Sequence, residues 1–121
     1  MKVTNMELER AGEALKELVK KEFPVVTSYA IISLVKRVAE ALDVSSSARD
    51  GLIRRYGKPD PKNNDLPAIQ PGDENWPKFN EEFGLLMTME VELIVAPVSI
   101  PKETALSPSV LVALEKFIKV T

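Results

Sequence analysis

The chain of 121 residues contains neither histidine nor cysteine. We therefore expect no zinc finger, no disulfide, no thiolate nucleophile and no Ser-His-Asp or Cys-His arrangement. Histidine also carries most acid–base catalysis near neutral pH. The carboxylates, lysines, tyrosines and hydroxyls that remain have no spacing that forms a recognisable active site. The sequence therefore predicts a protein that is not an enzyme and that uses no cofactor and no metal.

Long hydrophobic runs are missing too. The longest, such as Leu93–Val98, are far too short to span a bilayer. Charged residues, among them Lys2, Glu7 and Arg10, interrupt any apolar signal segment near the N-terminus. A net charge of −2 attracts neither nucleic acid nor an anionic membrane. We expect a cytoplasmic protein with no membrane contact, and the lack of cysteine is compatible with that compartment.

What is present is ordinary for one globular domain over residues 1–121, with 45% hydrophobic and 28% charged residues. The charge is unevenly spread. Residues 29–58 carry six Lys/Arg against three Asp/Glu, whereas residues 59–121 carry five against ten. A basic middle and an acidic C-terminal half indicate either complementarity within one molecule or a head-to-tail contact between copies.

Hydrophobic periodicity predicts about four helices. The first covers residues 5–22 and ends before Pro24. The second begins at Thr27 or Ser28 and is either one long central helix to residue 56 or two helices separated by a break at 43–47. A third extends from about residue 75, capped by Asp73 or Asn75, to Met87. The last begins at Ser107-Pro108 and extends to about Lys119, with Leu111 and Leu114 facing inward.

The remaining segments predict little β-structure. Four prolines in residues 57–75 allow at most a brief edge strand near Leu66–Ile69. Alternating apolar residues predict a strand over 89–95, with Glu90 and Glu92 on its solvent face. The predicted fold is α+β and mostly α, a single domain with a long central helix and a small hairpin or single strand.

Several short sequence segments follow one another in an order that resembles a known family. They are residues 1–5, 52–57, 79–83, 90–93 and 106–108. This order is similar to that of short hypothetical proteins of tailed bacteriophages, a family of unknown function. The resemblance implies a small, non-enzymatic accessory protein and supplies no functional residues. Ser45–Ser47 departs from the uninterrupted Glu/Lys-rich helix associated with such proteins.

The basic residues of the second helix form the first candidate binding surface. At 100° per residue, Lys36 shares an azimuth with Arg54 and Arg37 shares one with Arg55, with Lys58 between them. They form either a solvated helix face or a contact for an acidic partner or a phosphate-bearing ligand, which arginine binds bidentately. Duplex DNA is not expected, because neighbouring carboxylates dilute the patch and no groove-reading motif is present.

Two single residues complete the candidate site. A continuous helix places Arg49 in line with the apolar side chains, where its head is either paired with a carboxylate or directed at an interface or ligand. Trp76, the only tryptophan, is either a partly buried anchor or, if exposed, a binding hot spot. The second helix also carries apolar residues on more than one side, which indicates a deeply buried helix or helix–helix association; they are Ile32, Leu34, Ala41 and Val44.

The leading functional hypothesis is a phage-encoded accessory protein that binds a host or phage protein, for example an inhibitor of host defence or of transcription. One alternative is an oligomer that sequesters a nucleotide or another phosphorylated signal. The other is a structural or assembly component of the virion. The expected partner is a protein, with a second copy of the chain or a phosphate-bearing small ligand as further options.

Overall fold

The computed structural model describes residues 1–121 and contains four helices and three pairs of short strands. The helices are α1 (Asn5–Leu18), α2 (Val25–Tyr56), α3 (Trp76–Thr88) and α4 (Pro108–Ala113). The antiparallel pairs are β1 (Lys2–Thr4) with β4 (Glu90–Glu92) and β2 (Lys58–Asp60) with β3 (Leu66–Ala68), while β5 (Val98–Ile100) and β6 (Ile118–Val120) are parallel. The predicted α+β, mostly α class with a long central helix is confirmed.

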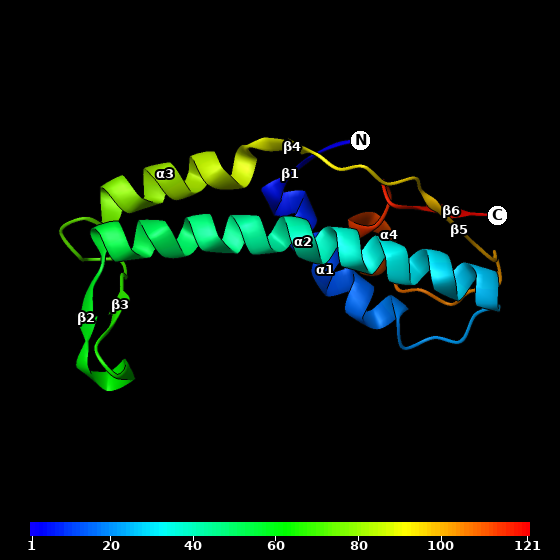
Figure 1. Ribbon diagram of the computed structural model, residues 1–121, viewed down its shortest axis with the longest axis horizontal. Coiled ribbons are helices and arrows are strands. Elements are labelled where there is room, and N and C mark those ends of the chain that lie inside the picture. The colour runs from blue at the N-terminus through cyan, green and yellow to red at the C-terminus, as the bar shows by residue number, and fades with distance from the viewer.

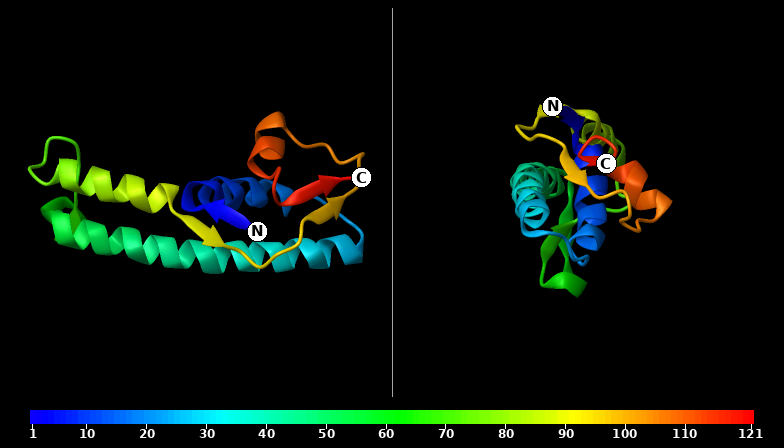
Figure 2. Two further views of the ribbon diagram at one scale, coloured as in Figure 1. Left: turned by 90° about the horizontal axis from the view of Figure 1, so that it is seen from above. Right: turned by 90° about the vertical axis from the view of Figure 1, so that its right-hand side faces the viewer.

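The molecule is elongated, because α2 extends along its whole length (Figure 1). Two parts share this helix. The body comprises residues 1–42 and 90–121, and in it α1 lies between α2 and α4 (Figure 2). The arm comprises residues 43–89, where α3 packs antiparallel to the C-terminal half of α2 and the β2–β3 hairpin projects from the far end (Figure 1).

One hydrophobic core holds the body together. Leu8, Leu18, Ile100, Leu114 and Phe117 are among its fully buried side chains. They come from the two ends of the chain, so the body closes only when residues about a hundred positions apart meet. The sixteen-residue core is Val3, Leu8, Ala11, Ala14, Leu15, Leu18, Ile31, Leu34, Val38, Leu93, Val98, Ile100, Val110, Leu114, Phe117 and Ile118.

Gly12 lies on the side of α1 that faces α2. A Cβ atom added there would lie 2.8 Å from Leu42 Cδ1, so the end of the Leu42 side chain would have to shift to accept a larger residue.

The long helix is continuous through its serine-rich middle, as one of the two predictions had it. Ser45 is buried, and its Oγ donates to the Leu42 carbonyl at 3.1 Å. This bond satisfies the buried hydroxyl within the helix. Ser45 therefore needs no hydrogen-bond partner outside the helix, and the helix continues through residues 43–47. The predicted start at Thr27 or Ser28 is wrong by about one turn: α2 begins at Val25, directly after Pro24, whose fixed φ suits entry into a helix.

Other boundaries differ from the sequence prediction. The first helix ends at Leu18 rather than residue 22, and the side chains of the next four residues are exposed where the chain turns toward Pro24. The third helix is as predicted, and Asn75 occupies its N-cap position, but without a side-chain capping bond. Asn75 Nδ2 donates instead to the Tyr56 carbonyl at 3.3 Å, and Asp73 accepts from the Gln70 N–H at 2.9 Å.

The C-terminal segment is the largest correction. Ser107 caps α4 as predicted, accepting from the Val110 N–H at 3.4 Å, but the helix ends at Ala113 instead of continuing to Lys119. The chain then turns so that Phe117 and Ile118 enter the core and β6 pairs with β5. Leu111, predicted to face inward, is exposed because the short helix contacts α1 with its other side.

The expected single strand is shorter than predicted, and it finds a partner. Only Glu90–Glu92 is a strand, in register with Lys2–Thr4, and both glutamates are exposed, as the alternation predicted. In the proline-rich loop, Pro59 and Pro67 face each other across β2 and β3, which suits residues that have no N–H to donate. No helix combines the length and hydrophobicity required to cross a membrane.

Candidate functional site

The predicted basic surface separates into two groups. All five of its side chains are exposed. Lys36 and Arg37 lie on the body, whereas Arg54, Arg55 and Lys58 lie at the outer end of the arm, where α2 passes into β2. Lys36 and Arg54 share an azimuth but are separated by about 27 Å along the helix axis. The structure therefore brings together only the three residues at the end of the arm.

The charges of these side chains are not equally available. Arg37 pairs with Glu40 at 3.7 Å, and Arg55 pairs with Glu82 of α3 at 3.7 Å. The Arg55 guanidinium also lies 6.0 Å from the centre of the Tyr56 ring. Lys36, Arg54 and Lys58 take part in no ion pair within the chain, so these three cations are free to meet an external carboxylate or phosphate.

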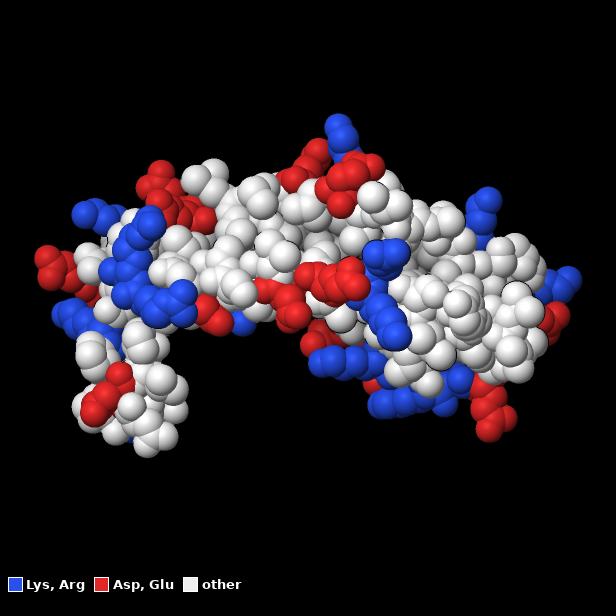
Figure 3. All heavy atoms as spheres, in the orientation of Figure 1, with Lys and Arg blue, Asp and Glu red and all other residues white.

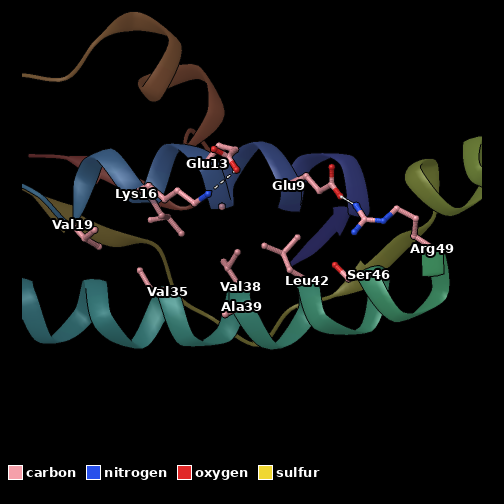
Figure 4. Close-up of a pocket in the computed structure, with 12 residues that line it drawn as sticks. Glu9, Glu13, Lys16, Val19, Val35, Val38, Ala39, Leu42, Ser46 and Arg49 are labelled. Atoms are coloured by element: carbon pink, nitrogen blue, oxygen red, sulfur yellow. Dashed lines mark hydrogen bonds and ion pairs between the residues drawn. The ribbon is translucent and has the colours of Figure 1, made fainter. Parts of the chain in front are cut away.

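Arg49 lies at the rim of a hollow of about 490 Å³ between α1 and α2 (Figure 4). Its guanidinium is 3.8 Å from the Glu9 carboxylate and 3.9 Å from that of Asp50. Two carboxylates thus already balance this arginine, which matches the predicted pairing rather than a site prepared for a phosphate. The apolar floor of the hollow comes from Leu15, Val35, Val38 and Leu42, with Glu13 and Lys16 paired at 3.0 Å on the rim.

Trp76 is a half-buried anchor of the arm. Its ring centroid lies 5.6 Å from that of Phe79, which in turn lies 5.6 Å from that of Phe83. This aromatic row covers the inner face of α3 against α2, because Phe79 is buried and its two neighbours are half-buried. Trp76 therefore stabilises the arm, and it is not an exposed hot spot.

An apolar surface that sequence analysis did not identify lies at the start of α2. Its side chains lie on the helix face opposite the buried Ile31 and Leu34. Figure 3 shows the corresponding uncharged area at the right-hand end of the molecule. We call this surface the apolar patch; its members and exposed fractions are Val25 84%, Val26 82%, Tyr29 75% and Ile32 54%.

Part of this patch had a signal in the sequence. The sequence predicts apolar residues on several sides of the second helix, and the structure separates them: Leu34 is buried, Ala41 is half-buried, and Ile32 and Val44 are exposed. Val25 and Val26 were missed because the helix was expected to begin after them. Once Pro24 is recognised as the residue before the helix, they join Tyr29 and Ile32 on one face.

One carboxylate of the body is stabilised in its charged form. The pKa of Glu7 is lowered by a hydrogen bond from the Lys116 ammonium and by the Thr4 backbone N–H. Glu7 Oε2 lies 2.7 Å from Lys116 Nζ, and its Oε1 accepts from the Thr4 N–H at 3.0 Å. This carboxylate caps α1 and fastens it to the C-terminal segment, so its role is structural. No group of three or more carboxylates is placed to hold a metal ion.

The fold and surface thus define a mostly helical α+β domain with an extended two-helix arm and an exposed apolar patch at the opposite end. No family model matches the chain, and comparison with the curated proteins and with the solved structures finds no match either. The resemblance to bacteriophage proteins therefore stays a prediction.

Proposed function

We propose that this protein acts by binding another protein through the apolar patch and catalyses no reaction. The observation that supports the proposal is the exposure of four large apolar side chains on one face of a regular helix. Soluble monomers rarely leave such side chains contiguous and uncovered, and patches of this kind are typical of protein–protein contacts. Tyrosine at the centre is a residue type enriched at interface hot spots.

The residues around the apolar patch indicate which side chains a partner needs. Beside it lies a hollow of about 210 Å³ lined by Val19, Phe23 and Ile32, of a size to receive one apolar side chain. Lys36, which forms no ion pair within the chain, follows one turn after Ile32 on the same face. The partner that fits has a projecting apolar side chain with a carboxylate about one helical turn away.

Together with the bacteriophage resemblance, this favours an accessory protein that binds a host or phage protein in the cytoplasm of the infected cell. An inhibitory role fits a small domain whose binding surface is displayed at one end, because occupying an apolar site on the target is sufficient to block it. The proposal requires no cofactor, since its energy comes from covering apolar surface.

Affinity purification from host and infected-cell lysates, with quantitative mass spectrometry, tests the proposal. The wild-type chain is expected to recover one partner in stoichiometric amount. Tyr29→Ala is expected to weaken recovery at limiting bait about tenfold or more, as for a hot-spot aromatic residue. Val112→Ala, at an exposed apolar position of α4 outside the patch, is the matched control and retains the partner.

Two outcomes contradict the proposal. Either no stoichiometric protein is recovered from any lysate, or Tyr29→Ala recovers the partner as well as the control does. Circular dichroism of both variants shows whether the helix is intact, so that a loss of binding is not mistaken for a loss of folding.

A further inference from the structure

A second uncovered face lies on the arm, away from the apolar patch. It is formed where α2 and α3 lie side by side, and it surrounds a hollow of about 250 Å³ lined in part by Val44, Ala48 and Met89. Two large apolar side chains on this face are open to solvent: Val44 is 72% exposed and Met89 51%. We call it the arm face.

Charged side chains flank the arm face at both ends. Figure 3 shows uncharged surface over the middle of the arm, Lys and Arg together with some Asp and Glu at its outer end, and mainly Asp and Glu, with Lys and Arg beside them, toward the middle of the molecule. On α2 the inner end of the arm carries Asp43, next to Glu40 of the body, which is paired with Arg37 at 3.7 Å; the outer end carries Arg54 and Lys58. Asp43 and Arg54 share nearly one azimuth, and neither forms an ion pair within the chain.

We infer that the arm face binds the arm face of a second copy of this chain, in an antiparallel arrangement with two-fold symmetry. A two-fold axis next to Ser47 and Ala48 reverses the direction of the partner helix, so the acidic inner end of each copy meets the basic outer end of the other. Asp43 of each copy then lies about two residues, roughly 3 Å along the helix, from direct opposition to Arg54 of the other, within reach of the long arginine side chain. Charge complementarity therefore specifies a second copy, since this surface carries both signs in mirrored order.

The same axis matches the shapes of the two helices. It sets Val44, the most exposed apolar side chain of α2 in the arm, opposite Gly51 of the other copy. A Cβ atom added to Gly51 would have only the mobile Arg54 Nη2 within 4 Å, at 3.9 Å, so open space lies over this residue. The valine of one copy fills that space in the other, and the two helices approach to the 8–10 Å typical of packed helices.

This inference is independent of the proposed function, because the arm face and the apolar patch lie at opposite ends of α2 (Figure 1). Self-association through the arms places two apolar patches at the two far ends of the dimer. A dimeric protein of this form binds two partner molecules, or two sites on one assembly, and gains avidity from doing so.

Sedimentation velocity over a range of protein concentrations tests the inference. The wild-type chain is expected to be a dimer that weakens as salt is raised, because exposed charges contribute. Val44→Glu and Asp43→Arg are each expected to raise the dimer dissociation constant at least about tenfold. All the substituted side chains are exposed, so folding is retained, and circular dichroism verifies this.

A double variant that restores the charge pair distinguishes this interface from any other mode of self-association. Asp43→Arg combined with Arg54→Asp exchanges the two charges and is expected to recover most of the dimer lost by Asp43→Arg alone. Because the chain has no cysteine, Ser47→Cys provides a second readout: it is expected to form a disulfide-linked dimer on mild oxidation, whereas Ser33→Cys on the body does not.

The inference is overturned if the wild-type chain is monomeric at every concentration reached. It is also overturned if a dimer forms that Val44→Glu leaves intact, or if Ser47→Cys and Ser33→Cys cross-link to the same extent. Loss of partner recovery by Tyr29→Ala with an unchanged dimer would leave both proposals standing, since the two surfaces are then shown to be separate.

Discussion

The body and the arm are built from the same helix but differ in how much side chain they bury. All sixteen residues of the core cluster belong to the body, whereas the arm buries only Phe79 and Met87 among its apolar residues. The arm is instead held by a row of three aromatic rings, one ion pair between Arg55 and Glu82, and three hydrogen bonds at its ends. Stability is therefore concentrated in the body, and the arm is the part that gains most from a partner.

The junction between the two parts is specific. Asn5 is buried at the start of α1, and its Nδ2 donates to the Leu86 carbonyl at 2.8 Å while its backbone N–H donates to the Met89 carbonyl at 3.2 Å. These bonds satisfy carbonyls at the C-terminal end of α3, where a helix leaves them without partners. One buried amide thus fixes the end of the arm to the body.

The largest expected effect is in the body core. Leu114 is fully buried, so Leu114→Ala leaves a cavity and is expected to lower the free energy of unfolding by about 3 kcal/mol or more. Urea denaturation monitored by circular dichroism measures this. Val112→Ala, two residues away but exposed, is the control and is expected to change stability by less than about 0.5 kcal/mol. Equal losses for the two variants would contradict the assignment of the core.

The next largest expected effect is on the stability of the arm alone, which distinguishes the arm from the body. Phe79→Ala removes the centre of the aromatic row, and it is expected to destabilise the arm by about 2–3 kcal/mol while leaving the body folded. Hydrogen exchange read by mass spectrometry is expected to accelerate in peptides from α3 and the second half of α2. The exposed neighbour Lys78→Ala serves as the control. Faster exchange throughout α1 as well would mean that arm and body unfold as one unit.

A smaller effect is expected at the junction. Asn5→Ala removes one hydrogen bond and leaves the Leu86 carbonyl with one partner fewer, at a cost of about 1–2 kcal/mol. The change should accelerate exchange at the end of α3 more than in α1. Met6→Ala, on the exposed side of the same turn, is the comparison variant. An unchanged exchange rate at Met87–Met89 would show that the junction is held by other contacts.

The smallest expected effect is the pH dependence of the stability that Glu7 contributes. The pKa of Glu7 is lowered in the folded chain, so its stabilising contribution is present above the unfolded pKa near 4.5 and is lost as the pH falls through the folded pKa. Because Glu7 and Lys116 are both partly exposed, Glu7→Gln is expected to cost about 1 kcal/mol or less at pH 7. The difference from wild type should shrink below pH 4, and a difference independent of pH would contradict this role.

The sequence was a good guide wherever local spacing determines structure. The long helix follows from apolar residues that resume at Leu52 and Tyr56 after the serines, and the start of α4 follows from Ser107-Pro108. The strands β1, β5 and β6 could not be predicted, because each has three residues and acquires its pairing from a segment distant in the chain. Lys2–Thr4 becomes a strand only because Glu90–Glu92 lies beside it.

The candidate site shows the same limit. Azimuths placed Lys36 and Arg54 on one face correctly, but whether a cation is free depends on carboxylates from other helices, such as Glu82 beside Arg55 and Glu9 beside Arg49. The apolar patch escaped detection because exposure is a tertiary property: the spacing of Tyr29 and Ile32 fits a helix, but it does not reveal that nothing covers them.

Native-state hydrogen exchange of the wild-type chain under increasing urea, at a protein concentration low enough to keep it monomeric, tests the central difference most directly. The account predicts that amides of α3 and of α2 beyond Asp43 open with a distinctly lower free energy than those of α1 and of α2 before Leu42. A single opening free energy shared by α1, α2 and α3 would contradict it.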